Sequence, residues 1–205
     1  MIKVTATFSK FSHYWFRYDT KMLFNGADES SKCLGSVVML NPGSATPINT
    51  NKDIFATSNA DFLKAEVALD QTMHSVKNML YFYYGKEIKG YFNILNLFNL
   101  KNENAAEALM QLRDLKNSNS INDYLFYDIK NLNKTLASSP FVWLAWGANL
   151  TQDIESIIYE NLALCGNKNV FYQLKKGFPH VKHPLYMTYK QRDSIKFQIE
   201  QLNKL

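Results

Sequence analysis

The chain contains few cysteines and no long apolar segment that is free of charge. Its two cysteines, Cys33 and Cys165, lie far apart without metal-ligand spacing, which argues against a zinc site or a disulfide framework. We expect both to be ordinary buried thiols, and we expect no metal and no cofactor. The first residues, MIKVTATFSK, are typical neither of a signal peptide nor of a transmembrane span. The sequence therefore predicts a soluble, cytoplasmic protein that does not bind a membrane.

Repeats and linkers are also lacking, which predicts a single domain over residues 1–205. With 46% hydrophobic and 14% aromatic residues, the chain can bury a sizeable core. Its net charge of +5 is a modest excess that suits a polyanionic partner, because lysine and arginine that neutralise phosphates release counterions. We therefore expect a nucleic acid or nucleotide as the partner, whereas the sequence does not indicate an oligomeric state.

Four short apolar runs predict buried strands at residues 37–40, 91–96, 141–146 and 169–173. Between these runs apolar residues recur at helical spacing, so strands and helices alternate along the chain. The alternation predicts an α/β fold: a three-layer α/β/α sandwich around a central, mainly parallel, four-stranded sheet. Residues 2–24 alternate imperfectly and are rich in aromatic residues, which predicts an additional strand or hairpin at the sheet edge.

A long amphipathic helix is predicted between the first two of these strands. It would begin at a cap at Ser58 or Asn59 and end just before Gly85. Its apolar positions recur at helical spacing and are Phe62, Leu69, Met73, Val76 and Leu80. On this helix Asp70 is a polar residue that we expect at the surface. Further helices are predicted around residues 105–115 and 122–136, from Ile154 towards Gly166, and after Thr188.

Polar loops follow the strands of the predicted sheet, and in such sheets ligands bind beyond the carboxyl ends of the strands. After the first strand, Asn41-Pro42-Gly43 opens a long polar loop, in which we expect Gly43 to adopt backbone angles closed to other residues. The other strand ends carry asparagines, a Trp-Gly pair and a histidine-containing loop. The residues that we expect around one crevice are Asn41, Pro42, Gly43, Ser44, Asn96, Phe98, Trp146, Gly147, Asn149, Lys182 and His183.

Five short motifs occur in a fixed order along most of the chain: LNPGSA, DQT at residues 70–72, NLF at residues 96–98, WGA, and GFPHVKHPLY. Over roughly residues 14–186 this set resembles an uncharacterised bacterial and phage family known as a domain of unknown function, DUF1643. That family is in turn similar, more distantly, to the uracil-DNA glycosylase superfamily. The resemblance implies the fold of that superfamily and a hydrolase that acts on a base in DNA.

The resemblance to glycosylases also implies roles for individual residues. A water-positioning loop after the first strand falls on Asn41, the residue that reads the base edge falls on Asn96, and the histidine of a His-Pro loop falls on His183. The chain departs from the superfamily at two places. Its His-Pro loop reads HPLY, and Asn41 stands where the fastest members have an aspartate. Because an amide cannot take a proton, Asn41 could orient a water molecule but not act as a general base.

Cleavage of a base from its sugar needs these groups independently of the resemblance. Positive charge develops on the sugar and negative charge on the departing base, so a site needs a placed water, a donor to the base and an amide that recognises the base edge. Asn41, His183 and Asn96 offer these groups, which makes Asn41 and His183 the candidate catalytic residues. Each also has a plainer interpretation, in which Asn41 caps the turn before Pro42 and His183 hydrogen-bonds the backbone.

Two function classes therefore remain open. One is a glycosylase-like hydrolase that cleaves, or once cleaved, the N-glycosidic bond of a nucleobase in DNA; the other is a non-catalytic module that holds a nucleobase, nucleotide or nucleic acid in the same crevice. Lys175, Lys176 and Lys182 are expected to flank the crevice and attract phosphates, or else to form a solvated face. The dense N-terminal aromatic residues are expected to pack in the core, and the alternative is that they stack on bases.

Overall fold

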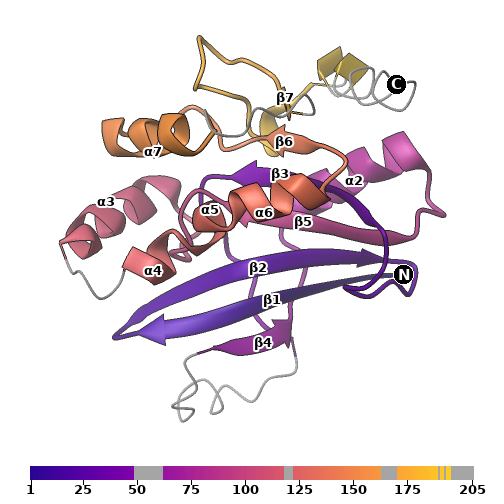
Figure 1. The fold of residues 1–205 in the computed structure, drawn as a ribbon, viewed down its shortest axis with the longest axis horizontal. Helices are drawn as coiled ribbons and strands as arrows, with labels where there is room; N and C mark the ends of the chain where they lie inside the picture. Colours follow the sequence, from indigo (N-terminus) through magenta and orange to yellow (C-terminus); the bar gives the residue numbers. More distant parts are fainter. Residues whose placement is uncertain (49–61, 118–121, 163–169, 189, 192, 195–205) are drawn as a thin grey trace.

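The structure of the protein is a computed structural model that describes residues 1–48, 62–117, 122–162, 170–188, 190–191 and 193–194. It is an α/β fold in which one seven-stranded mixed sheet carries helices on both faces (Figure 1). The strands are β1 (Ile2–Phe11), β2 (Tyr14–Phe24), β3 (Cys33–Met39), β4 (Leu63–Glu66), β5 (Gly90–Asn96), β6 (Val142–Leu144) and β7 (Val170–Tyr172). The helices are α2 (Gln71–Tyr84), α3 (Ala105–Lys116), α4 (Asn122–Leu125), α5 (Tyr127–Lys130), α6 (Leu132–Ser138), α7 (Gln152–Leu162) and the 3-10 helix η1 (Pro184–Tyr186).

The sheet has the strand order β4-β1-β2-β5-β3-β6-β7. Strands β5, β3, β6 and β7 are parallel to one another, and they correspond to the apolar runs predicted as strands. The prediction of a mainly parallel four-stranded sheet is nevertheless wrong, because β2, β1 and β4 extend the sheet through antiparallel pairings. The hairpin of β1 and β2 lies inside the sheet, because β2 pairs with the edge of β5 and β4 pairs with the outer edge of β1.

Helix α2 starts later in the chain than the sequence predicts. Residues 63–66, expected within the helix, instead form β4, because the outer edge of β1 offers unpaired backbone groups with which this segment can pair. The helix begins after Asp70, whose Oδ1 accepts a hydrogen bond from the Met73 N–H at 2.8 Å. It ends at Gly85, as predicted, where φ is 83°. Asp70 is therefore a helix cap and not a residue of the helix surface.

Apolar side chains fill the space on both faces of the sheet. On one face Val37 and Met39 of β3 pack with the apolar side of α2. On the other face Val38 and Leu40 pack with residues of α3 to α7. Successive residues of a strand point to opposite faces, so this short run is buried on both sides, as the sequence predicts. The N-terminal aromatic residues also contribute to the core, for example Phe16, which is fully buried.

Several sequence predictions concern residues outside the described ranges: the caps Ser58 and Asn59, the thiol of Cys165, and most of the helix after Thr188. Cys33, at the start of β3, is half-buried instead of buried. Within the described ranges, no helix is both long and apolar enough to cross a membrane. The same ranges contain no cluster of three or more histidine, cysteine, aspartate or glutamate side chains suited to a metal ion.

Candidate functional site

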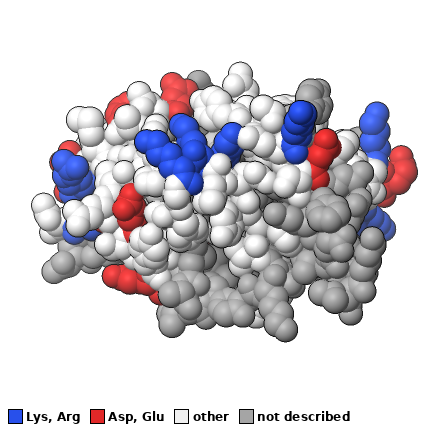
Figure 2. Space-filling view, turned by 90° about the horizontal axis from the view of Figure 1, so that it is seen from above, with Lys and Arg blue, Asp and Glu red and all other residues white. Residues whose placement is uncertain are grey.

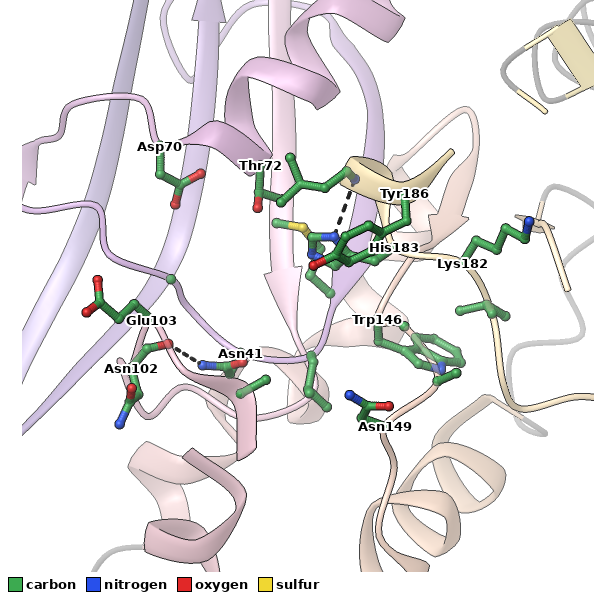
Figure 3. Close-up of a pocket in the computed structure, with 18 of the residues that line it drawn as sticks. Asn41, Asp70, Thr72, Asn102, Glu103, Trp146, Asn149, Lys182, His183 and Tyr186 are labelled. Carbon is green, nitrogen blue, oxygen red and sulfur yellow. Dashed lines mark hydrogen bonds between the residues drawn. The ribbon is translucent and has the colours of Figure 1, made fainter. Parts of the chain in front are cut away.

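A pocket with a volume of about 380 Å³ lies beyond the carboxyl ends of the parallel strands (Figure 3). Segments far apart in the sequence build its wall: part of β2, the loops after β3, β5 and β6, the start of α2, and the segment from β7 to η1. The predicted site residues that line it are Asn41, Gly43, Trp146, Gly147, Asn149, Lys182 and His183. The fold thus brings together most of the strand-end residues that the sequence analysis singled out.

Four predicted site residues do not line this pocket. Pro42 is buried and Ser44 is exposed, although both belong to the loop after β3. Asn96 and Phe98 are fully buried, with exposed fractions of 0%. The prediction that Asn96 lines one cavity with Asn41 and His183 is therefore wrong. The hydrogen bonds of Asn96, described below, give the reason.

The side chain of Asn41 is held by the loop after β5. Its Nδ2 donates hydrogen bonds to the carbonyl oxygen of Asn102 at 2.8 Å and to that of Pro42 at 3.1 Å. Asn102 in turn donates its backbone N–H to the Pro42 carbonyl at 3.1 Å. Both amide hydrogens of Asn41 are thereby engaged, which leaves its Oδ1 to accept a hydrogen bond from water or from a ligand.

A carboxylate lines the pocket close to the loop that carries Asn41. Asp70 uses Oδ1 to cap α2, and its Oδ2 lies 3.1 Å from the position that a Cβ on Gly43 would occupy. Glycine at position 43 is therefore explained by this close approach. The expected left-handed backbone is absent there, because φ of Gly43 is not positive. A carboxylate can accept a proton from water, whereas the amide of Asn41 cannot.

The imidazole of His183 reaches the pocket from the segment before η1. Its Nδ1 accepts a hydrogen bond from the Leu185 N–H at 3.4 Å, which assigns the proton of the neutral ring to Nε2. Burial lowers the pKa of His183, and the nearby charge of Asp70 opposes this shift without cancelling it. Near neutral pH the ring is therefore uncharged and offers an Nε2–H donor.

The loop after β7 is anchored to the wall of the pocket. The Nε1–H of Trp146 donates a hydrogen bond to the Pro179 carbonyl at 2.8 Å. His180 contacts the neighbouring loop and α7, since its Nδ1 lies 3.2 Å from the Ala148 carbonyl and its Nε2 lies 3.5 Å from a carboxylate oxygen of Glu155. These contacts fix the position of the loop, and they give His180 a structural role outside the pocket.

Two of the three lysines predicted to flank the crevice line the pocket. Lys175 and Lys182 belong to its wall, whereas Lys176 is exposed and lies outside it. Basic side chains form a group on the face shown in Figure 2, which looks onto the molecule from the side of β7 in Figure 1. The pocket also contains acidic groups, so its lining carries charges of both signs.

Asn96 belongs to a buried polar network that holds the core together. Its backbone N–H and its Nδ2 donate to Oδ2 of Asp128, at 3.0 and 3.4 Å. Asp128 also accepts a hydrogen bond from the Asp19 N–H at 3.2 Å, and its own N–H donates to Oδ1 of Asn99 at 3.3 Å. The network links β2, β5 and α5. These hydrogen bonds hold Asn96 in the core, where its Oδ1 has no donor among the described residues, and Asn96 does not line the pocket.

We expect Asp128→Ala to lower the free energy of unfolding by about 2–4 kcal/mol, because it removes the buried acceptor of these N–H donors. Urea unfolding measures the change, and Asp114→Ala at an exposed position of α3 is the matched control, expected to stay within about 0.5 kcal/mol of wild type.

Burial raises the pKa of Asp128 from 3.8 to about 6. Folding therefore takes up a proton between these values, so stability from this group decreases as the pH rises from 3.8 to about 6. This pH dependence of stability should vanish in Asp128→Ala. If Asp128→Ala is as stable as wild type, the hydrogen-bond network does not stabilise the core.

Three charged residues that line the pocket, Arg17, Asp70 and Glu103, were not predicted from the sequence. A signal for Asp70 exists, because aspartate is a preferred N-cap and apolar residues at helical spacing begin at Met73. The helix start predicted near residue 58 concealed it. Arg17 carries no comparable signal, since a charged residue in an aromatic strand does not reveal which side of the sheet, or which neighbour, it will meet.

The chain matches no protein-family model, no curated protein and no solved structure. A functional interpretation therefore depends on the pocket itself. Its distinctive feature is that the amide of Asn41, the carboxylate of Asp70 and the uncharged imidazole of His183 line one cavity although they belong to three separate segments.

Proposed function

We propose that the protein is a glycosylase-like hydrolase that takes a nucleobase into this pocket and hydrolyses its N-glycosidic bond. The observation that carries the proposal is the convergence of a general-base candidate, a water-positioning amide and a neutral donor: Asp70, Asn41 and His183. These are the groups that the reaction requires, because it needs an activated water on one side and a stabilised leaving base on the other.

The size and lining of the pocket suit a nucleobase with its sugar. Its volume of about 380 Å³ is within the range of small-molecule sites, about 300–1,000 Å³. Trp146, 2% exposed, lines one end of the pocket, and Tyr186, 78% exposed in the same lining, offers an aromatic surface on which a base can stack. Asn149 lines the same end and takes the role of reading the base edge in place of the buried Asn96.

In the proposed reaction Asn41 and Asp70 prepare the attacking water. The Oδ1 of Asn41 accepts one hydrogen bond from the water, and Asp70 takes a proton from it as the water oxygen forms a bond to the sugar C1′. The bond from Met73 N–H fixes one oxygen of Asp70, and the absence of a side chain at Gly43 lets the carboxylate approach the loop. In this reaction Asp70 is the general base, a role that the amide of Asn41 cannot take.

The bond between C1′ and the base nitrogen breaks as the bond to water forms, and its electron pair leaves with the base. The Nε2–H of His183 donates a hydrogen bond to the departing base and stabilises its negative charge. The base then takes a proton from solvent. An uncharged imidazole suits this role because its orientation is fixed by the bond that Nδ1 accepts from Leu185.

The resemblance to DUF1643 and to uracil-DNA glycosylases supports the proposal through the order of its motifs. The motifs LNPGSA, NLF, WGA and GFPHVKHPLY occur in the expected order, at or after the carboxyl ends of β3, β5, β6 and β7, respectively. Two features differ from the fold expected from that resemblance: the antiparallel strands β1, β2 and β4, and the burial of Asn96. We therefore assign the roles from the pocket, and the preferred base is left to experiment.

The test is a screen of single-stranded and duplex oligonucleotides that carry uracil and other altered bases, scored for abasic sites. We expect the wild-type protein to release a base from at least one of them. A double variant with Asp70→Asn and His183→Ala should release none above background. If the wild-type protein binds a nucleobase or nucleotide tightly but releases no base over hours, the hydrolase is contradicted, and the pocket is that of a non-catalytic binding module.

We expect Lys175→Ala together with Lys182→Ala to weaken the salt dependence of duplex DNA binding, because both lysines line the pocket. Each lost phosphate contact should lower the slope of log affinity against log salt by about 0.9. Lys176→Ala is the matched control, because this neighbouring lysine is exposed outside the pocket and should leave the slope unchanged. An unchanged slope in the double variant would mean that the two lysines form only a solvated face.

A further inference from the structure

A buried arginine in the wall of the pocket has no part in the proposed reaction. Arg17, on β2, is 1% exposed and lines the pocket. Its Nε–H has no hydrogen-bond acceptor among the described residues, and its Nη1 donates one long hydrogen bond of 3.4 Å to the Ala45 carbonyl. Buried polar side chains are normally hydrogen-bonded, so an unpaired guanidinium N–H in the wall of a pocket points to a missing partner.

The charge of Arg17 is also incompletely balanced within the fold. In the described part of the chain no carboxylate lies within ion-pair distance of it, although Asp70 and Asp128 attract it from farther away. Burial lowers the pKa of Arg17 despite this attraction. Lys101 is a second cation nearby, and burial together with repulsion by Arg17 lowers its pKa as well. Lys101 does not line the pocket, but an anion bound at Arg17 lessens the repulsion between the two cations.

We propose that Arg17 binds a phosphate monoester, so that the ligand of the pocket is a nucleoside monophosphate, either free or at the 5′ end of a strand. The planar guanidinium presents parallel N–H donors whose spacing matches phosphate oxygens. The identification of the ligand as a nucleotide rests on the proposed function, in which a base occupies the Trp146 end of the pocket.

The burial of Arg17 favours a terminal phosphate over one inside a strand. A phosphodiester continues into another nucleotide on each side, whereas a phosphate monoester ends the molecule. With 1% of its surface exposed, Arg17 can be reached only by the end of a ligand. Lys175 and Lys182 are more accessible and remain available for the backbone phosphates of a strand.

The arrangement of the pocket is consistent with a base, a sugar and a phosphate bound in a row. In Figure 3 Asp70 lies at one end and Trp146 towards the other, with Asn41 and His183 between them. Arg17 belongs to the Asp70 end, because Asp70 attracts it and because it bonds to the loop just after Gly43. A nucleotide with its base at the Trp146 end and its phosphate at the guanidinium therefore places C1′ near the proposed reacting groups.

Two carboxylates face the proposed phosphate, those of Asp70 and Glu103. Glu103 is exposed, so solvent screens its charge. Asp70 repels a phosphate, and the positive charge of Arg17 at the same end of the pocket compensates for this repulsion.

The test compares the affinities of the four common nucleosides and of their 5′-monophosphates by calorimetry, with inorganic phosphate as a further probe. For at least one base, the wild-type protein should bind the monophosphate about tenfold to a hundredfold more tightly than the nucleoside. Arg17→Gln should abolish this ratio, and Arg113→Gln, at an exposed position of α3, should preserve it. Oligonucleotides with a 5′-phosphate and with a 5′-hydroxyl then distinguish a strand end from a free nucleotide.

The proposal is overturned if the wild-type protein binds no monophosphate, or binds none better than its nucleoside, or if Arg17→Gln retains the ratio. Arg17→Met and Arg17→Gln should be at least as stable as wild type in thermal unfolding without ligand, because both remove an uncompensated buried charge. If both variants fail to fold, Arg17 is structural and the proposal fails. This binding experiment does not depend on base release. If the protein prefers monophosphates but releases no base, the phosphate site is supported and the proposed hydrolase function is contradicted.

Discussion

Asp70→Asn should slow base release by about a hundredfold to ten-thousandfold, because asparagine can position a water molecule but cannot take its proton. The substitution leaves the fold in place, since asparagine is as good a helix N-cap as aspartate and can still accept the bond from the Met73 N–H. Single-turnover rates on the substrate identified by the screen measure the effect, and urea unfolding verifies that the variant is folded.

The control for this substitution is Asp114→Asn, which changes the same side chain at an exposed position of α3. It should leave the rate unchanged, because it removes a negative charge far from the pocket lining. A folded Asp70→Asn variant with the rate of wild type would show that Asp70 is a helix cap and nothing more. The general base would then have to be sought elsewhere in the pocket, with Glu103 as the remaining carboxylate in its lining.

His183→Ala should slow base release by about a hundredfold to a thousandfold, the usual effect of removing one donor to a developing negative charge. The affinity for the ligand should change much less, because the donor acts mainly on the departing base. His74→Ala, at an exposed position of α2, is the matched control and should have no effect on either quantity. Equal losses of affinity and rate would instead make His183 an ordinary ligand contact.

The pH profile gives a second measurement of the same role. Burial lowers the pKa of His183 from 6.5, so the uncharged ring predominates at a pH where a free imidazole is half protonated. Protonation would place a hydrogen on Nδ1, which faces the Leu185 N–H, and would break the bond that orients the ring. The rate of base release should therefore decrease with a midpoint below pH 6.5. A midpoint above this value would contradict the assignment.

The parallel half of the sheet could be predicted from sequence because its strands are buried on both faces and read as continuous apolar runs. The antiparallel half was harder to predict. The segment that contains Leu63 follows helical spacing, and its structure depends on the free edge of β1, a partner distant in the chain. For the same reason the sequence placed the N-terminal hairpin at the sheet edge, whereas β4 makes it internal.

The candidate site was predictable where its residues follow parallel strands directly, as Asn41 and Trp146 do. It was not predictable where long-range contacts decide which way a side chain points. Asn96 is the last residue of a parallel strand, yet Asp128 from α5 accepts hydrogen bonds from its backbone N–H and its Nδ2 inside the core. Arg17 comes from the antiparallel hairpin, and it reaches the pocket only because β2 pairs with β5.

The order of strands in the sheet has a consequence for synthesis of the chain. The ribosome produces β1, β2 and β3 first, but both neighbours of β3 in the sheet, β5 and β6, come later in the sequence. Pairings between such distant segments are slow to form, and unpaired strand edges in unfinished chains are prone to aggregate. Because the pocket needs both Arg17 and His183, it cannot be completed until the chain has emerged beyond His183. A ligand that requires both ends of the pocket therefore stabilises chains that contain both segments and gives no protection to shorter nascent ones.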